Sequence, residues 1–172
     1  MYVDTFDCIR TKLDIREFSP EQVPDEIKLK VLEAARLTGT GLNTQHWRFI
    51  LVEDKQNLED LAKYSTSGKW VAGCNFAIII LTNPKYNFHL IDAGRVIQNV
   101  QLAAWNFDVG SGIFTGIEKD NFRKHYNIPE ELNISAVIGF GYPARKITGD
   151  RKDRITLDSL VYFEKYGISN KS

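Results

Sequence analysis

The chain has 172 residues, enough for one domain with a sizeable core, and we expect a single domain over residues 1–172. Its 22 basic and 22 acidic residues give a net charge of zero, which argues against a general nucleic-acid binder. Two cysteines and three histidines, without metal-type spacing, argue against a disulfide framework or a metal site. The N-terminus lacks a signal-peptide pattern and the longest apolar run, residues 76–81, is too short to span a bilayer. We therefore expect a soluble cytoplasmic protein with no membrane partner.

The hydrophobic pattern mixes helices and strands without a strict βαβ alternation. Helices are predicted over residues 4–12, from Pro24 to near Gly39, and over 54–64, 92–107 and 119–126. Strands are predicted over residues 47–52, 76–81, 109–114 and 135–141. The run 76–81 is apolar at every position, which indicates a central strand covered on both faces. The fold class is therefore α+β, with a mixed, mostly antiparallel central sheet flanked by helices.

The predicted helix 92–107 is the most apolar of these elements. Its apolar residues recur at three- and four-residue spacing: Ala93, Val96, Ile97, Val100, Ala103, Ala104 and Phe107. Its polar residues form one narrow stripe: Asp92, Arg95, Asn99 and Asn106. A helix with so little polar circumference is expected in a core or at an interface. A glycine-rich turn, residues 109–112, follows it and either presents backbone N–H groups to a ligand or simply leads into a strand.

No nucleophile–base pair, phosphate-binding loop or metal-binding motif is present, so we predict no catalytic side chain. The three histidines are scattered, and each is more readily interpreted as a surface or hydrogen-bonded residue than as a catalyst. Any enzymatic chemistry must then come from a cofactor. Cations near both ends of the chain are candidates for a phosphate site, with solvated surface charge as the competing interpretation: Arg10, Lys12, Arg16, Lys152 and Arg154.

Several segments, in this order, resemble the nitroreductase family of FMN-dependent oxidoreductases. The first runs from Ile9 to Phe18 (IRTKLDIREF) and the second is Asn43–Phe49 (NTQHWRF), close to the family pattern N-x-Q-P-W-x-F. DAG at 92–94 and QNVQLAA at 98–104 resemble the family's long central helix. GFGYP at 139–143 and KDRITLD at 152–158 resemble its last strand and its tail. The resemblance covers nearly the whole chain.

The resemblance implies a phosphate site for FMN made by Lys12, Lys152 and Arg154. It places Arg16 near the N1/O2 edge of the flavin, where a fixed cation favours the negative charge that reduction creates. It also implies a homodimer with flavin at the interface and the long helix at the centre of that interface.

Four further contacts are implied by the same resemblance. Asn43 and Gln45 would offer side-chain amides to the cofactor. The backbone N–H groups of Thr115 and Gly116 would approach the flavin N5 and O4. The implied activity is oxidation of NADH or NADPH and reduction of a nitroaromatic, a quinone or another flavin, by ping-pong hydride transfer.

The sequence departs from the family pattern at several positions. Asp14 stands where serine is common and would repel a phosphate, unless it orients Lys12 or Arg16. His46 replaces the usual proline, and residues 65–69 lack a clear flavin-binding asparagine. The short connection after residue 81 predicts an open pocket. Two alternatives follow: a non-enzymatic flavin- or nucleotide-binding sensor, and a flavin-consuming or dehalogenating member of the same family.

Overall fold

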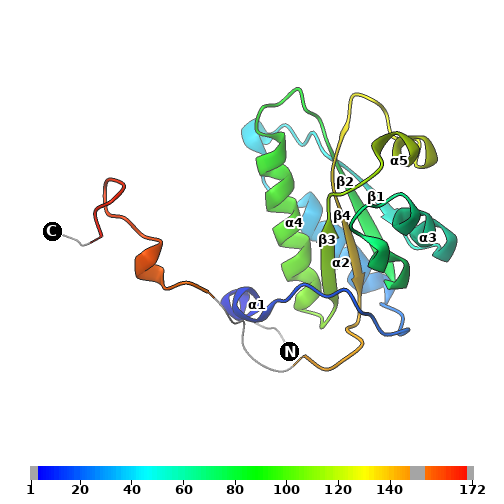
Figure 1. Ribbon diagram of the computed structural model, residues 1–172, viewed down its shortest axis with the longest axis horizontal. Helices are drawn as coiled ribbons and strands as arrows, with labels where there is room; N and C mark the ends of the chain where they lie inside the picture. The colour runs from blue at the N-terminus through cyan, green and yellow to red at the C-terminus, as the bar shows by residue number, and fades with distance from the viewer. Residues whose placement is uncertain (1–3, 148–153, 170–172) are drawn as a thin grey trace.

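The computed structural model describes residues 4–147 and 154–169. A four-stranded antiparallel sheet with the order β1-β2-β4-β3 forms its centre (Figure 1). The strands are β1 (Arg48–Val52), β2 (Phe76–Thr82), β3 (Gly110–Phe114) and β4 (Asn133–Gly141). All residues of β2 are buried, as expected for an all-apolar strand between two neighbours.

Helices cover both faces of this sheet. The helices are α1 (Thr5–Thr11), α2 (Asp25–Arg36), α3 (Lys55–Lys63), α4 (His89–Trp105) and α5 (Lys119–His125), with short 3-10 turns η1 (Gly41–Asn43), η2 (Lys69–Gly73) and η3 (Leu157–Ser159). The helices α2 and α4 lie on one face and α3 and α5 on the other (Figure 1). Asp54 caps α3 by accepting a hydrogen bond from the Asn57 N–H at 3.0 Å, as its position before the helix predicts.

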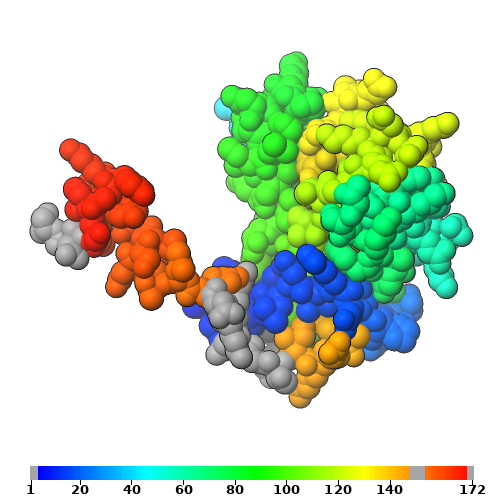
Figure 2. Space-filling model, viewed as in Figure 1, coloured from blue at the N-terminus to red at the C-terminus, as the bar shows by residue number. Residues whose placement is uncertain are grey.

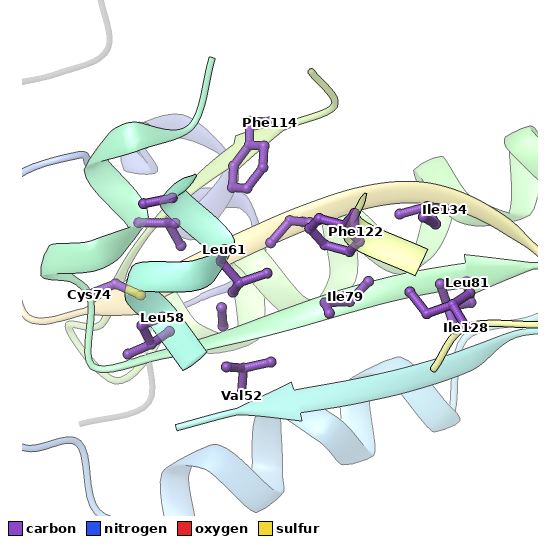
Figure 3. Close-up of a cluster of buried hydrophobic side chains, with 14 residues drawn as sticks. Val52, Leu58, Leu61, Cys74, Ile79, Leu81, Phe114, Phe122, Ile128 and Ile134 are labelled. Carbon is purple, nitrogen blue, oxygen red and sulfur yellow. The ribbon is translucent and has the colours of Figure 1, made fainter. Parts of the chain in front are cut away.

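Alternate side chains of β2 divide the interior into two clusters, because successive strand residues point to opposite faces. Phe76, Ile78 and Ile80 pack with α2 and α4 in one cluster. The other cluster, which contains Ile79 and Leu81, packs under α3, η2 and α5 (Figure 3). The two clusters pack the sheet between α2 and α4 on one face and α3 and α5 on the other. The sheet therefore supports the loops at its ends.

The predicted fold class is confirmed, and each predicted helix and strand is present with boundaries shifted by up to three residues. The prediction of a glycine-rich turn is wrong at Gly110 and Gly112, which lie inside β3. These glycines make room for a crossing segment: a Cβ on Gly112 would lie 2.5 Å from the Ile15 carbonyl oxygen and 2.7 Å from the Trp70 ring. The polar stripe of α4 also differs from expectation, because Asp92 is buried.

The segment 154–169 projects away from the sheet and its helices (Figures 1 and 2). Most of its large apolar side chains are exposed, in contrast to those of the sheet: Ile155, Leu157, Leu160, Val161, Tyr162, Tyr166 and Ile168. An exposed apolar segment of this kind is typical of a surface that another molecule covers. Within the described ranges, no helix is both long enough and apolar enough to cross a membrane.

Candidate functional site

The segment after α1 crosses the glycine-containing strand β3 and then runs beside the end of β4. The Ile15 N–H donates to the Ser111 carbonyl at 2.8 Å, in a parallel bridge between Asp14 and Ser111. Further along, the Ala144 N–H donates to the Glu17 carbonyl at 3.0 Å. Backbone hydrogen bonds therefore fix the path of residues 14–17, although the segment belongs to no helix or strand of its own.

A cavity of about 400 Å³ opens between this segment and the chain that leaves β4. Its lining consists of Asp14, Ile15, Arg16, Glu17, Pro143, Ala144, Arg145 and Ile147. The cavity is open to solvent.

Charges at this cavity are mostly balanced in pairs. Lys12, a buried residue, forms an ion pair with Asp14. Arg145 and Glu17 form a second, exposed pair at 2.7 Å. Arg16 is exposed, and in the described part of the chain no carboxylate pairs with it. Asp14 thus contacts Lys12 rather than Arg16, and Arg16 is the cation available to an anionic or electron-rich ligand.

The strand β3 ends at Phe114, so Thr115 and Gly116 lie beyond its pairing with β4. The Gly116 carbonyl accepts a hydrogen bond from the Thr66 N–H at 2.8 Å. A Cβ at position 116 would clash with the Thr66 and Ser67 hydroxyl oxygens, so these side chains would have to move for any residue other than glycine. Hydroxyl groups, rather than an asparagine amide, therefore stand beside this strand end.

The predicted residues Asn43 and Gln45 lie at the other end of α4. Both are exposed, and the Gln45 Nε2 donates to the Asn43 Oδ1 at 3.3 Å. Their loop is attached near the start of α4 through a hydrogen bond from the Gly41 N–H to Asp92. The seventeen residues of α4 span about 24 Å at ~1.5 Å per residue. One chain therefore does not bring the two amides together with Lys12 and Arg16.

The C-terminal cations complete the predicted set. Arg154 is exposed at the start of the projecting segment. Lys152 lies outside the described residues. The predicted residues that the structure describes thus lie in separate places: the cationic segment 12–16 bridges β3 at Ser111, residues 115 and 116 follow the end of β3, and the amide loop 43–45 lies near the start of α4.

A buried polar network was missed by the sequence prediction. The His46 Nε2 lies 3.1 Å from the Asp92 Oδ2, and both side chains are 2% exposed. Arg95 reaches the same carboxylate at 3.3 Å. The one available signal was His46 at a position where the family pattern has proline. That signal did not reveal the partner, because Asp92 is 46 positions away along the chain.

The remaining reactive groups are held in structural contacts. The His89 Nδ1 lies 2.8 Å from the Thr82 hydroxyl, and His125 lies 3.5 Å from Asp60. Burial raises the pKa of the Cys74 thiol to about 12, which keeps it protonated and unreactive near neutral pH. Among the described residues, no group of three or more histidine, cysteine, aspartate or glutamate side chains is placed to hold a metal.

Comparisons with known proteins agree with this architecture. The family model described as "Nitroreductase family" matches residues 9–73 and 66–142. An Archaeoglobus fulgidus protein provisionally named NADH dehydrogenase/NAD(P)H nitroreductase is 31% identical over 144 residues, 78% of this chain and 83% of that protein. The iodotyrosine deiodinase of Thermotoga neapolitana is 20% identical over 80% of this chain and 88% of its own. An FMN-dependent nitroreductase structure from Clostridium difficile superposes with a TM-score of 0.83 at 23% identity, over 90% of this chain and 96% of that one.

The chain therefore belongs to the nitroreductase family. This confirms the resemblance seen in the sequence and identifies the protein as an oxidoreductase of that family.

Proposed function

We propose that this protein is an FMN-dependent oxidoreductase that uses NADH or NADPH to reduce a nitroaromatic, a quinone or another flavin by ping-pong hydride transfer. The observation that carries this proposal is the cavity lined by residues 14–17, where the exposed Arg16 follows the buried ion pair of Lys12 with Asp14, in a chain of the nitroreductase family. The names of the A. fulgidus relative and of the C. difficile structure support the nicotinamide donor and the flavin, respectively.

The residues at this cavity fit FMN by their chemistry. FMN, when bound, supplies the group that accepts a hydride from the nicotinamide and delivers electrons to the acceptor. Lys12 binds its phosphate through charge-assisted hydrogen bonds, and Asp14 keeps the Lys12 ammonium in place. We propose that Lys152 and Arg154 contribute the remaining positive charge from the C-terminal segment.

Arg16 and the end of β3 supply the electrostatic part of the site. Arg16 would supply a fixed positive charge to the N1/O2 edge of a bound flavin, which would favour the reduced cofactor. The backbone N–H groups of Thr115 and Gly116 would bind the N5/O4 edge and orient the ring. The Thr66 and Ser67 hydroxyls lie beside Gly116 and are available to the same edge.

We further propose a homodimer that assembles this site from two copies. The amide loop with Asn43 and Gln45 lies at the opposite end of α4 from Lys12, so a second copy has to supply it. Exposed apolar residues on α4 and α1 offer an interface: Leu90, Ile91, Phe6 and Ile9. The apolar segment 154–169 adds further surface to cover. We also propose a cytoplasmic location, in line with the free, buried Cys8 and Cys74.

The first experiment is a visible absorption spectrum of the purified protein, repeated after adding FMN and then NADH or NADPH without oxygen. We expect a flavin band that bleaches on adding nicotinamide and returns on adding a quinone or nitroaromatic. A folded protein that neither carries nor binds FMN would refute the proposal. A bound flavin that no nicotinamide reduces would favour the sensor alternative.

A mixed dimer tests the composite site. One copy carries Lys12→Ala with Arg16→Ala, and the other carries Asn43→Ala with Gln45→Ala. In a site built from two copies, one of the two sites in the mixed dimer is intact, so we expect one FMN per dimer at wild-type affinity. Each variant homodimer has no intact site, so we expect neither of them to bind FMN at wild-type affinity. A mixed dimer without a wild-type site would overturn the shared-site geometry.

The similarity to an iodotyrosine deiodinase favours one further test of the acceptor. The reduced protein is mixed with a halogenated phenol, and free halide is measured beside the nitroaromatic and quinone assays. Halide release with slow nitro and quinone reduction would favour the dehalogenating alternative. Analysis of the flavin after aeration reports whether the flavin itself is consumed.

A further inference from the structure

The loop that carries Asn43 and Gln45 has an unfavourable backbone conformation. Leu42, Asn43 and Gln45 have φ angles of 52°, 54° and 46°, in the left-handed region that residues with a side chain seldom adopt. Such conformations are unfavourable, less so for Asn43 than for Leu42 and Gln45, and they persist only where the surroundings enforce them. Since the side chain of Leu42 is 90% exposed, burial of that residue does not hold the loop in place.

The buried carboxylate of Asp92 holds the two ends of this loop, and inside the loop Thr40 accepts hydrogen bonds from the N–H groups of Asn43 and Gln45. The Gly41 N–H donates to Asp92 at 3.0 Å, and the His46 Nε2 lies 3.1 Å from its Oδ2. Arg95 adds an ion pair at 3.3 Å from the same helix. Residues 41 and 46 are the two ends of the strained loop, so one carboxylate fixes both of them.

His46 extends this network to a third segment. Its Nδ1 lies 3.3 Å from the backbone nitrogen of Asn83 and accepts the hydrogen bond from that N–H. The Nε2 must then carry the ring proton and donate it to Asp92. The imidazole also packs against Tyr86, with ring centroids 5.1 Å apart. The histidine therefore ties the loop to both α4 and the β2–α4 connection.

Packing leaves the loop little freedom at its first residue. A Cβ on Gly41 would lie 2.6 Å from the Phe88 ring, so glycine allows the backbone to lie directly on that ring. The outer part of the loop has the opposite character, because Leu42, Asn43 and Gln45 are all exposed. The base is fixed and its tip presents two amides outward, as expected of a preorganised binding element.

We propose that His46 and Asp92 are positioning residues that hold loop 41–45 in its strained form, so that Asn43 and Gln45 are already in place when FMN binds. This inference rests on the proposed function, and it assigns the flavin affinity partly to a buried pair that does not touch the flavin. When the pair is lost, the loop relaxes, and binding has to order it again.

The test is FMN binding to the purified apo-protein, followed by quenching of flavin fluorescence at a temperature far below unfolding. We expect Asp92→Asn to weaken FMN binding by up to about tenfold, the loss expected when both amides are removed, and His46→Ala to have a similar effect. His46→Gln keeps a side-chain N–H donor and should recover most of the loss. The matched control is Asp60→Asn, which breaks a second aspartate–histidine pair, between Asp60 on α3 and His125 on α5.

Each outcome decides a different point. Weaker binding by folded Asp92→Asn and His46→Ala, with recovery in His46→Gln and no change in Asp60→Asn, supports the inference. If wild type, Asp92→Asn and His46→Ala bind FMN with equal affinity, the inference is wrong. It is also wrong if Asp60→Asn loses as much FMN affinity as the other two variants. If Asp92→Asn does not fold, the comparison of His46→Ala with His46→Gln decides. A wild-type protein that binds no FMN refutes the proposed function itself.

Discussion

The two ends of α4 hold their neighbouring segments through different kinds of contact. At its N-terminal end, Asp92, His46 and Gly41 form a closed hydrogen-bonded network that fixes a strained loop. At its C-terminal end, the Trp105 indole donates to the Thr11 hydroxyl at 3.0 Å, which docks α1 and leads into the cationic segment beside an open cavity. The N-terminal end of α4 therefore carries a loop of fixed geometry, and the C-terminal end lies next to a segment rich in positive charge.

In the proposed flavin site, this difference separates contacts that act through charge from contacts that depend on a fixed backbone geometry. In the proposed site, the charged contacts gain their energy from the ligand's own charge, so they tolerate an open cavity. The neutral amides contribute less per contact and therefore have to be held in position beforehand. The following substitutions test that division, in order of expected effect.

The largest effect is expected at the charged end. Lys12→Ala with Arg16→Ala removes two charged hydrogen bonds, at about 1.5–3 kcal/mol each, so FMN affinity should fall at least a hundredfold. Wild-type binding should weaken with added salt and the variant's binding should depend on salt much less. Titration calorimetry at two salt concentrations measures both, with Lys55→Ala plus Lys124→Ala as a charge-matched control. An unchanged affinity for FMN would show that Lys12 and Arg16 do not bind the cofactor.

The path of that segment depends on a glycine in β3. In Gly112→Ala the new methyl group would lie 2.5 Å from the Ile15 carbonyl oxygen, so the crossing segment has to move. We expect the free energy of unfolding to fall by about 1–3 kcal/mol, measured by urea denaturation. Gly73→Ala is the control, because a Cβ there meets nothing within 4 Å. Equal stability of the two variants would contradict the close contact.

A smaller effect is expected at the geometric end. Asn43→Ala with Gln45→Ala removes neutral hydrogen bonds, worth about 0.5–1.5 kcal/mol each, so FMN affinity should fall about tenfold. The loss should be the same at low and high salt, in contrast to the variant of the charged end. A salt-dependent loss, measured by the same calorimetric titrations, would show that the loop acts through charge after all.

The smallest effect is a gain in stability. Leu42 is exposed and has a φ of 52°, a conformation that asparagine tolerates better than leucine. Leu42→Asn should raise the free energy of unfolding by about 0.5–1 kcal/mol in thermal or urea denaturation. Leu37→Asn serves as control, because Leu37 is also exposed but has an ordinary φ of −77°. A similar change in both variants would indicate an effect of surface polarity alone.

Much of the fold could be predicted from local patterns. The apolar run at β2 indicated a central strand, the three- and four-residue spacing indicated α4, and Asp54 indicated the start of α3. These signals are local because strand pleating, helix periodicity and capping involve neighbouring residues. The ordered motifs also identified the family, which the family comparison confirms.

The site was less accessible to prediction. The cationic and amide residues could be named, but not their placement at opposite ends of α4. Asp14 could have oriented either Lys12 or Arg16, and the fold pairs it with Lys12. Asp92 was assigned to a polar stripe, and the fold buries it.

The sequence by itself determined the elements, the family and the residue types that a flavin site would use, because each of these depends on short-range pattern. Only the tertiary structure decided that Asp92 accepts hydrogen bonds from the Gly41 N–H and from His46, and that the segment 14–17 crosses β3. Those contacts join residues far apart along the chain, and the burial that makes a carboxylate bind so many donors exists only once the chain is folded.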